Sequence, residues 1–361
     1  MYRLLSLILV LATATHAVAV VAADAATANA ITADVLDVPA ARSALAPRTL
    51  LNGLARAGDR VVAVGQRGHV VYSDDAGANW QQAEVPVSSD LVAVSFPSPS
   101  VGWAVGHDGV ILHTNNSGAT WSRQLDGRRA GELMLEAYPE DASAKDADHA
   151  AALHETAQRF AAQGAENPFL DVWFADEHDG YVVGAFGTIL HTTNAGATWQ
   201  PWLHAVDNPG GLHLYAIRNA GADVYIVGEQ GLVLHLDRKT ARFERLELPY
   251  KGTLFGVIGD DRSVVVFGLR GTVLRSIDRG ASWQPIVTGL QVGMTGGSVG
   301  ADGRFVIVSQ AGHVLASDDA GESFALQPVQ QPLPAAAVVA ANGGALIVAG
   351  PRGVRALPAA H

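Results

Sequence analysis

Short apolar runs separated by glycine-containing turns recur along most of this chain. The clearest pair is residues 102–114 and 180–192, where a run bounded by glycines is followed by a turn and by a second apolar run that ends in His-Thr. Apolar runs of this length between turn residues predict buried strands, and glycine supplies the positive φ that a tight hairpin needs. The pattern predicts an all-β protein of short antiparallel strands.

The hairpin glycines repeat with a period of about 40 residues. The first stands at positions 65, 106, 184, 228, 268 and 350, with Ser309 in its place in one unit, and a second glycine follows three residues later in all seven units. Twelve residues further on, six units carry an aromatic: Trp80, Trp121, Trp199, Phe243, Trp283 and Phe324. Such regular spacing indicates that each unit is one supersecondary motif, here a four-stranded meander.

The turn before the fourth strand has a recurrent sequence in five units. It starts with Ser or Thr, has Asp or Asn two residues later and Gly two residues after that, and ends in the aromatic. Asp and Asn cap their own backbone in such turns, and we expect the tryptophans at the end of the turn to be buried between neighbouring blades. This is the Asp-box, or BNR, pattern, which assigns a structural role to Trp80, Trp121, Trp199, Trp283 and Phe324.

Seven such units predict a seven-bladed β-propeller of four-stranded antiparallel blades over residues 48–361. The last unit, 335–357, is long enough for only three strands. We therefore expect the preceding segment 24–47, and residues 31–45 in particular, to supply the missing outer strand, which would close the ring and remove its open edges.

One insertion, residues 126–168, separates the second and third units. Within it, residues 148–163 place Leu153, Ala157, Phe160 and Ala161 on one helical stripe, with Gly164 as a stop. This predicts an amphipathic helix. We expect its apolar face to pack on the propeller; the alternative is that a partner covers it.

Residues 1–23 have the features of a secretory signal peptide. A positive start at Arg3 precedes an apolar run over 4–12 and then small residues, with cleavage expected after Ala19 or Ala23. The alternative is an uncleaved anchor, because residues 4–23 contain no charge and are long enough to cross a bilayer. Either way we expect an exported protein, in the periplasm, or in the thylakoid lumen if the host is photosynthetic.

Composition excludes several functions. Without cysteine, the chain forms no disulfide and no thiolate zinc or iron–sulfur site. A net charge of −11 argues against binding to nucleic acid, which needs a basic face. His113, His191 and His235 occupy one position in three units; because a ring would hold them far apart, we expect hydrogen bonds there, no metal and no cofactor.

Segments 167–174, 184–190, 212–217, 227–231 and 248–256 carry a closer likeness. Through them, residues 48–355 resemble the photosystem II stability/assembly-factor family of BNR propellers and its proteobacterial relatives. The resemblance implies a non-enzymatic factor that assembles or stabilises a membrane complex. We expect it to be monomeric and to bind a subunit of that complex. That complex is photosystem II in photosynthetic relatives; in this acidic chain without cysteine, a transporter or another complex is the alternative.

Variable turns predict where a partner binds. In a four-stranded meander, the turns between second and third strands share one rim with the connections between blades, while the repeated Asp-box turns occupy the other. The variable tips are Arg67, His107, Asp108, Phe186, Glu229, Gln230, Arg270, Gln310 and Arg352. Loops that vary on a repeated framework suit recognition. The alternative is that these tips are merely solvated.

A glycosidase is the rival function, because sialidases and some glucanases use Asp-box propellers. A sialidase-like site would draw on Arg67, Arg270 and Arg352 with Tyr250 and Glu229, and a glucanase-like site on two carboxylates among Asp108, Asp171 and Glu229. The chain lacks an early arginine motif of the sialidase type, and its unit count differs from the six of that family. A non-enzymatic role is therefore favoured.

Overall fold

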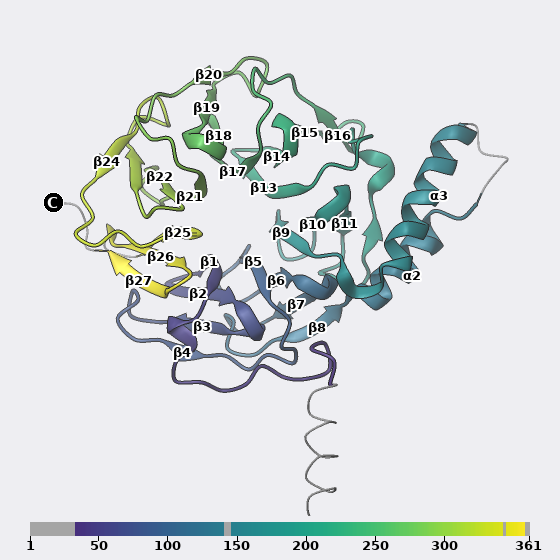
Figure 1. The fold of residues 1–361 in the computed structure, drawn as a ribbon, viewed down its shortest axis with the longest axis horizontal. Helices are drawn as coiled ribbons and strands as arrows, with labels where there is room; N and C mark the ends of the chain where they lie inside the picture. The colour runs from purple at the N-terminus through teal and green to yellow at the C-terminus, as the bar shows by residue number, and fades with distance from the viewer. Residues whose placement is uncertain (1–32, 141–145, 342–343, 358–361) are drawn as a thin grey trace, which may run out of the picture.

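The structure, a computed structural model, describes residues 33–140, 146–341 and 344–357. In these residues, 27 strands form seven separate antiparallel sheets, each a meander in chain order. The first strand of every sheet contacts the first strand of the next, and that of the seventh contacts that of the first. The sheets are therefore the blades of a ring (Figure 1), and the predicted seven-bladed propeller is confirmed.

The blades have the following strands. Blade 1 comprises β1 (Leu51–Ala57), β2 (Arg60–Gly65), β3 (Val70–Ser73) and β4 (Gln81–Gln82), and blade 2 comprises β5 (Leu91–Ser95), β6 (Gly102–Gly106), β7 (Ile111–Thr114) and β8 (Ser122–Leu125). Blade 3 comprises β9 (Phe169–Phe174), β10 (Gly180–Gly184), β11 (Ile189–Thr192) and β12 (Gln200–Pro201), and blade 4 comprises β13 (Leu214–Ala220), β14 (Asp223–Gly228), β15 (Val233–Asp237) and β16 (Arg242–Arg245). Blade 5 comprises β17 (Leu254–Gly259), β18 (Val264–Gly268), β19 (Val273–Ser276) and β20 (Gln284–Pro285), and blade 6 comprises β21 (Met294–Val299), β22 (Phe305–Ser309), β23 (Val314–Ser317) and β24 (Ala325–Gln327). Blade 7 has β25 (Ala337–Ala340), β26 (Leu346–Gly350) and β27 (Gly353–Leu357).

Each Asp-box turn is closed by its own side chains. In blade 1, the Ser73 hydroxyl donates to the Asp75 carboxylate at 2.8 Å and accepts the Gly77 N–H at 2.8 Å. The same carboxylate accepts the Asn79 N–H at 2.8 Å. Equivalent bonds recur in blades 2, 3, 5 and 6. The turn therefore satisfies its own backbone N–H groups wherever the pattern is present.

The turn aromatics join each blade to the one before it. Trp121 packs in one cluster with Val62 and Val64 of blade 1, and Trp283 packs with Tyr225 and Val227 of blade 4. Trp121, Trp199 and Trp283 are buried, as predicted.

Burial of Trp80 was also predicted, and this prediction is wrong, because Trp80 is only half-buried. It packs against Val339 and Ile347 of blade 7, a sheet that has only three strands among the described residues. The Trp80 indole keeps part of its surface in solvent. Phe324 is likewise half-buried.

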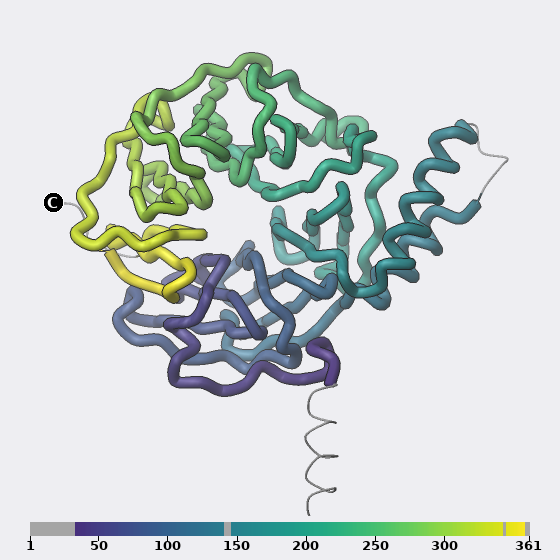
Figure 2. Tube along the Cα trace, in the orientation of Figure 1, coloured from purple at the N-terminus to yellow at the C-terminus, as the bar shows by residue number. Residues whose placement is uncertain are grey.

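Among the described residues, no added N-terminal strand closes the ring, and residues 24–32 of the predicted segment lie outside them. Residues 33–50 contain turns and one 3-10 turn, η1 (Ala46–Arg48), but no strand. The segment instead runs along the outer edge of blades 1 and 2 (Figure 2), where Ala40 N–H donates to Val85 O at 3.1 Å and Ser88 N–H donates to Val35 O at 2.8 Å. Leu36 fixes it there, because it is the residue whose side chain enters the core between these blades.

The insertion is a hairpin of two helices, α2 (Gly127–Ala137) and α3 (Ala147–Ala162) (Figure 1). The second matches the predicted helix, and the first was not predicted. Gly131 lowers the helix propensity of α2, yet a Cβ there would lie 3.2 Å from Ala161 Cα, so a small residue allows the helices to pack closely. Sequence periodicity alone did not reveal this helix because the contact that explains Gly131 exists only in the folded structure.

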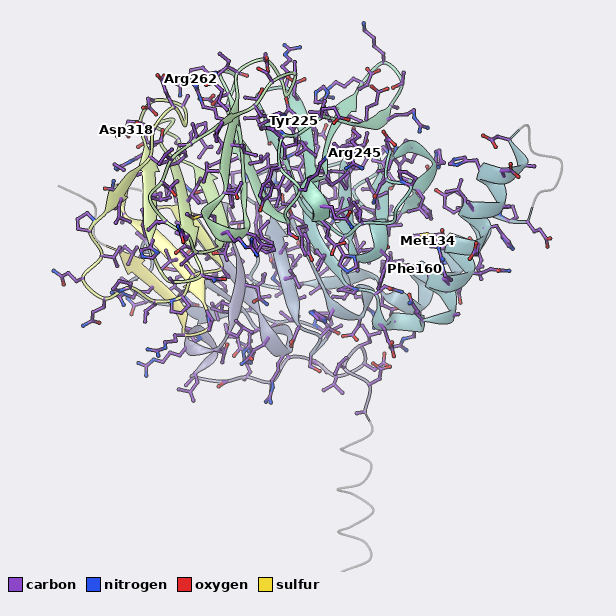
Figure 3. The ribbon with its side chains drawn as sticks, turned by 45° about the horizontal axis from the view of Figure 1, so that its top comes forward. Met134, Phe160, Tyr225, Arg245, Arg262 and Asp318 are labelled. Carbon is purple, nitrogen blue, oxygen red and sulfur yellow. The ribbon has the colours of Figure 1, made fainter. Side chains whose placement is uncertain are left out.

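The hairpin packs on blades 2 and 3. Ala130 and Met134 of α2 and Ala157 and Phe160 of α3 are buried in the cluster that contains Trp103. Met134 and Phe160 are labelled in Figure 3. Within the described residues, no helix combines the length and the apolar character needed for a membrane span. The predicted signal peptide lies outside the described residues.

We predict that Trp121→Ala and Trp283→Ala each lower the free energy of unfolding by about 3–5 kcal/mol, because each removes a buried ring between two blades. Trp80→Ala should cost less, since this ring is already partly in solvent. Denaturant unfolding of the three purified variants measures the difference. Equal losses of unfolding free energy in Trp80→Ala and Trp121→Ala would contradict the expected dependence of this loss on how far the ring is buried.

We also predict a loss of stability in acid from the Asp-box carboxylates. The pKa of three Asp-box carboxylates is lowered from 3.8 to about 2 by hydrogen bonds that they accept. The chief donor is the Asn79 N–H for Asp75, the Ser282 hydroxyl for Asp278 and the Ser317 hydroxyl for Asp319. A pKa lower in the folded than in the unfolded state stabilises the fold above the unfolded pKa. This contribution is lost as pH falls from 3.8 through about 2.

The test is a double variant, Asp278→Asn with Asp319→Asn. Asn116 already fills this position in blade 2, where its amide donates to Thr120 Oγ1 at 2.8 Å, so the substitution has a native precedent. Urea unfolding at a series of pH values should show a smaller loss of stability for the variant than for the wild type between about pH 4 and pH 2. Parallel curves would show that these carboxylates do not set the acid limit.

Candidate binding face and central channel

The turns between second and third strands form one rim of the ring. In five blades they are single 3-10 turns, namely η2 (Gln66–Gly68), η3 (His107–Gly109), η5 (Ala185–Gly187), η7 (Glu229–Gly231) and η8 (Leu269–Gly271). The base of the insertion lies on the same rim, since η3 contacts both α2 and η4 (Gly164–Glu166). We call this face the tip rim.

The central residue of each 3-10 turn has a left-handed backbone. The φ angles are 56° at Arg67, 57° at Asp108, 55° at Phe186, 53° at Gln230 and 57° at Arg270. This conformation costs a residue with a Cβ about 1–2 kcal/mol. Here the turn as a whole imposes the left-handed conformation on the central residue, and the residue that follows is a left-handed glycine. The side chain at the centre is therefore free to differ from blade to blade while the backbone stays the same.

The three predicted arginines on the tip rim are exposed and unpaired. Arg67, Arg270 and Arg352 belong to blades 1, 5 and 7. In the described part of the chain, their guanidinium groups make no hydrogen bond and no ion pair, although the Arg67 backbone N–H donates to Asp90 at 2.7 Å. Their five N–H donors each are available to an anionic partner.

The remaining tip residues differ in their surroundings. Phe186, 53% exposed, packs edge-on against the His213 ring with centroids 4.8 Å apart, and Glu229 accepts the His213 N–H at 2.9 Å. His107 and Gln310 line the mouth of the central channel. Asp108 is half-buried beside the base of α2, and Gln230 is exposed.

A channel runs through the ring, and its wall has a feature that sequence reasoning missed. Six of the seven inner strands carry a β-bulge at their second residue. A bulge redirects the side chain of the extra residue. The bulged residues Asn52, Val92, Leu170, Tyr215, Phe255 and Thr295 all line the tip-side half of the channel, a cavity of about 610 Å³. Because the residue types differ, no sequence motif marks them.

Two of the residues considered for a glycosidase, Asp171 and Tyr250, are engaged in local contacts. Asp171 is buried in the channel wall and pairs with Arg218, and Tyr250 donates its hydroxyl to the Leu269 carbonyl oxygen at 3.3 Å. The tyrosine close to Glu229 is instead Tyr215, whose pKa is raised by burial and then by the Glu229 charge.

The equivalent histidines form local contacts. His191 Nε2 lies 2.8 Å from Asp179 Oδ1, and His235 Nε2 lies 3.1 Å from Asp223 Oδ1, so hydrogen bonding is confirmed at two of the three positions. His113 packs against the Trp103 ring instead, and burial lowers its pKa. Among the residues the structure describes, no group of three or more acidic or histidine side chains is placed to hold a metal.

Fold and turn chemistry together define a seven-bladed propeller of the Asp-box class. A sequence model of the family described as "Photosynthesis system II assembly factor YCF48" matches residues 55–163 and 155–332. These ranges include most of the chain, and the protein belongs to this family.

Curated relatives share part of the sequence. The photosystem II assembly lipoprotein Ycf48 of Synechococcus sp. (strain CC9902) is 28% identical over 161 residues, which cover 44% of this chain and 48% of that protein. The photosystem II stability/assembly factor HCF136 of Oryza sativa subsp. japonica is 25% identical over 182 residues, covering 43% and 44%. The matched region thus spans about half the length of these relatives.

Solved structures share the fold. A structure described as YCF48 bound to D1 peptide superposes with a TM-score of 0.61 at 14% identity, covering 87% of this chain and 95% of that one. A streptogramin B lyase superposes with a TM-score of 0.63 at 12% identity, covering 86% and 94%. At such low identity, both likenesses concern the fold alone.

Proposed function

We propose that this protein is a non-enzymatic assembly or stability factor that binds an exposed segment of a membrane-complex subunit through its tip rim. The observation that carries the proposal is the set of left-handed tips, which hold different side chains on an identical backbone. A surface of this kind suits recognition of one particular partner. Membership of the YCF48 family supports the assembly role, and the relative described as bound to D1 peptide supports recognition of a peptide segment.

The chemistry of the tip rim indicates which segment it binds. Arg67 and Arg352 stand on blades 1 and 7, whose inner strands contact each other, so both belong to one side of the rim. Arginine pairs with carboxylates through two parallel hydrogen bonds, and arginine and aromatic side chains dominate the energetic centres of protein interfaces. With Phe186 exposed on blade 3, the rim fits a segment that carries both acidic and apolar residues.

We further propose that the protein is monomeric and exported, and that its leader is removed between Ala19 and Ala25. The positive start, apolar run and small residues of positions 1–23 support export. Mass spectrometry of the N-terminus of the protein recovered from the periplasmic or lumenal fraction should show the shortened chain. Recovery of intact Met1 in the membrane fraction would identify an uncleaved anchor.

The partner site is tested by charge reversal. The triple variant Arg67→Glu, Arg270→Glu and Arg352→Glu should no longer crosslink to the partner. Its affinity for the partner should fall at least about 30-fold, because the loss of a single hot-spot residue costs about 2 kcal/mol of binding free energy. The matched control is Arg245→Glu, because Arg245 is an exposed arginine on the outermost strand of blade 4 (Figure 3). An unchanged set of crosslinked partners in the triple variant would contradict the proposed surface.

The contribution of the insertion needs a substitution, because a deletion would uncover the core. Removing residues 127–166 takes Ala130, Met134, Ala157 and Phe160 out of the cluster around Trp103. Leu135→Glu changes an exposed position of α2 instead.

Hydrolysis of a sialoside or glucan by the purified protein, abolished by Glu229→Gln, would favour the glycosidase.

A further inference from the structure

A charged pair in the channel wall departs from the repeat. The third residue of each inner strand, or its equivalent in blade 7, is small in six blades: Gly53, Ala93, Ala216, Gly256, Gly296 and Ala337. There is little room here, since a Cβ added to Gly296 would lie 2.5 Å from Ala336 O of the next blade. In blade 3 the same position is Asp171. Blade 3 therefore has an acidic side chain where the other six blades have glycine or alanine.

Asp171 is held by the neighbouring blade, yet not fully satisfied. Its Oδ2 accepts the Ile217 N–H at 2.8 Å and pairs with Arg218 Nη1. Its side chain is 4% exposed, and its Oδ1 is buried with no hydrogen-bond partner. A buried carboxylate is costly unless it is paired, so Asp171 requires the Arg218 charge.

Arg218 uses only one of its nitrogens for this pairing. Nη1 contacts Asp171 and also donates to Ile217 O at 2.6 Å. Within the described residues, Nε and Nη2 make no hydrogen bond, and 39% of the side chain is exposed. Asp171 thus fixes one edge of the guanidinium and leaves the other edge, which carries two parallel donors, without a partner.

The unpaired edge belongs to a residue at the centre of the channel. Arg218 lines both the tip-side cavity of about 610 Å³ and a second cavity of about 460 Å³ on the Asp-box side. The other residues common to both cavities are Leu54, Val94, Val257, Gly297 and Val338, which are apolar. Toward the tips, the rings of Tyr215 and Phe255 meet edge to face, with centroids 5.7 Å apart. The tip-side cavity has the size typical of ligand sites, and its lining is more apolar than polar.

We propose that the central channel binds a monoanionic carboxylate with an aromatic or aliphatic body. Arg218 Nε and Nη2 receive the carboxylate as a bidentate pair, the apolar wall and the Tyr215 and Phe255 rings contact the body, and Asp171 positions the guanidinium. Because Asp171 already neutralises part of the arginine charge, a singly charged carboxylate suits the site better than a phosphate dianion. The carboxylate belongs either to a small organic acid or to the C-terminus of a peptide that enters from the tip rim.

The probes separate these two sources. Calorimetric titration of the full chain uses phenylacetate and a pentapeptide that ends in phenylalanine with a free carboxylate, each compared with its neutral amide. At least one carboxylate should bind, with its amide at least about tenfold weaker, because the charge-assisted hydrogen bonds are lost. Binding of the peptide alone identifies a chain end, and binding of phenylacetate alone identifies a small acid. No carboxylate binding, or equal binding of the amides, would overturn the proposal.

The variants locate the binding. Arg218→Ala alone would strand the buried Asp171, so the main variant combines Asp171→Ala with Arg218→Ser, residues that blade 2 carries at the same positions as Ala93 and Ser95. Its affinity for the carboxylate should fall at least about tenfold, while its unfolding transition stays unchanged. Arg245→Ala on the outer strand should bind the carboxylate like the wild type. Retained affinity in the double variant would place the ligand elsewhere.

Two further variants cover the remaining outcomes. If the double variant does not fold, Arg218→Lys keeps the charge beside Asp171 but removes the two-donor edge, and it should also weaken binding about tenfold; affinity within twofold of wild type would contradict the proposal. The triple charge reversal at Arg67, Arg270 and Arg352 should leave phenylacetate binding unchanged. A failure of the proposed tip-rim function can therefore be distinguished from a failure of the proposed channel site.

Discussion

The contact between each Asp-box aromatic and the preceding blade is the interaction on which this ring depends. Strands within a blade are joined by backbone hydrogen bonds, but the seven sheets are separate. Side-chain packing therefore joins the blades, together with backbone bonds such as that from Trp121 N–H to Glu84 O at 2.9 Å. Blade 4 shows which part of the motif matters most. It lacks the turn pattern, and its Asp237 accepts the Lys239 N–H instead, yet Phe243 is fully buried against blade 3. The hydrogen-bonded turn can be replaced, whereas the buried ring is present in that blade too.

Because the Asp-box turns on one rim join the blades, the exposed side chains on the other rim can vary. The tips reach the same left-handed backbone with Arg67, Asp108, Phe186, Gln230 or Arg270 at the centre. The local strain of each turn is carried by the packed blades beneath it. A framework of this kind can change its partner by exchanging exposed side chains, with little effect on the core. The acidic overall charge of the chain therefore does not describe its tip rim, where three exposed arginine side chains have no hydrogen-bond or ion-pair partner among the described residues.

The channel follows a different logic from the tips. Its wall is built from inner strands that must approach closely, which explains the glycine and alanine at the third residue of six blades. Asp171 occupies this position only because Ile217 N–H and Arg218 of the next blade receive its charge. A buried ion pair of this kind contributes little to stability compared with apolar packing. Its presence at a single blade is therefore better explained by the orientation it gives Arg218 than by stability.

The sequence by itself determined the number of blades, the Asp-box turns and the helix α3. Each depends on chemistry within a few residues: glycine spacing, hydroxyl and carboxylate caps, or one apolar stripe. Only the tertiary structure decided the rest. The N-terminal segment lies beside blades 1 and 2 because Leu36 packs into the cluster between them, and α2 accommodates Gly131 because α3 packs against it. Asp171 and Arg218, which are 47 residues apart, meet because ring geometry brings two inner strands together. Local patterns encode local hydrogen bonds, whereas contacts between blades exist only once the ring has formed.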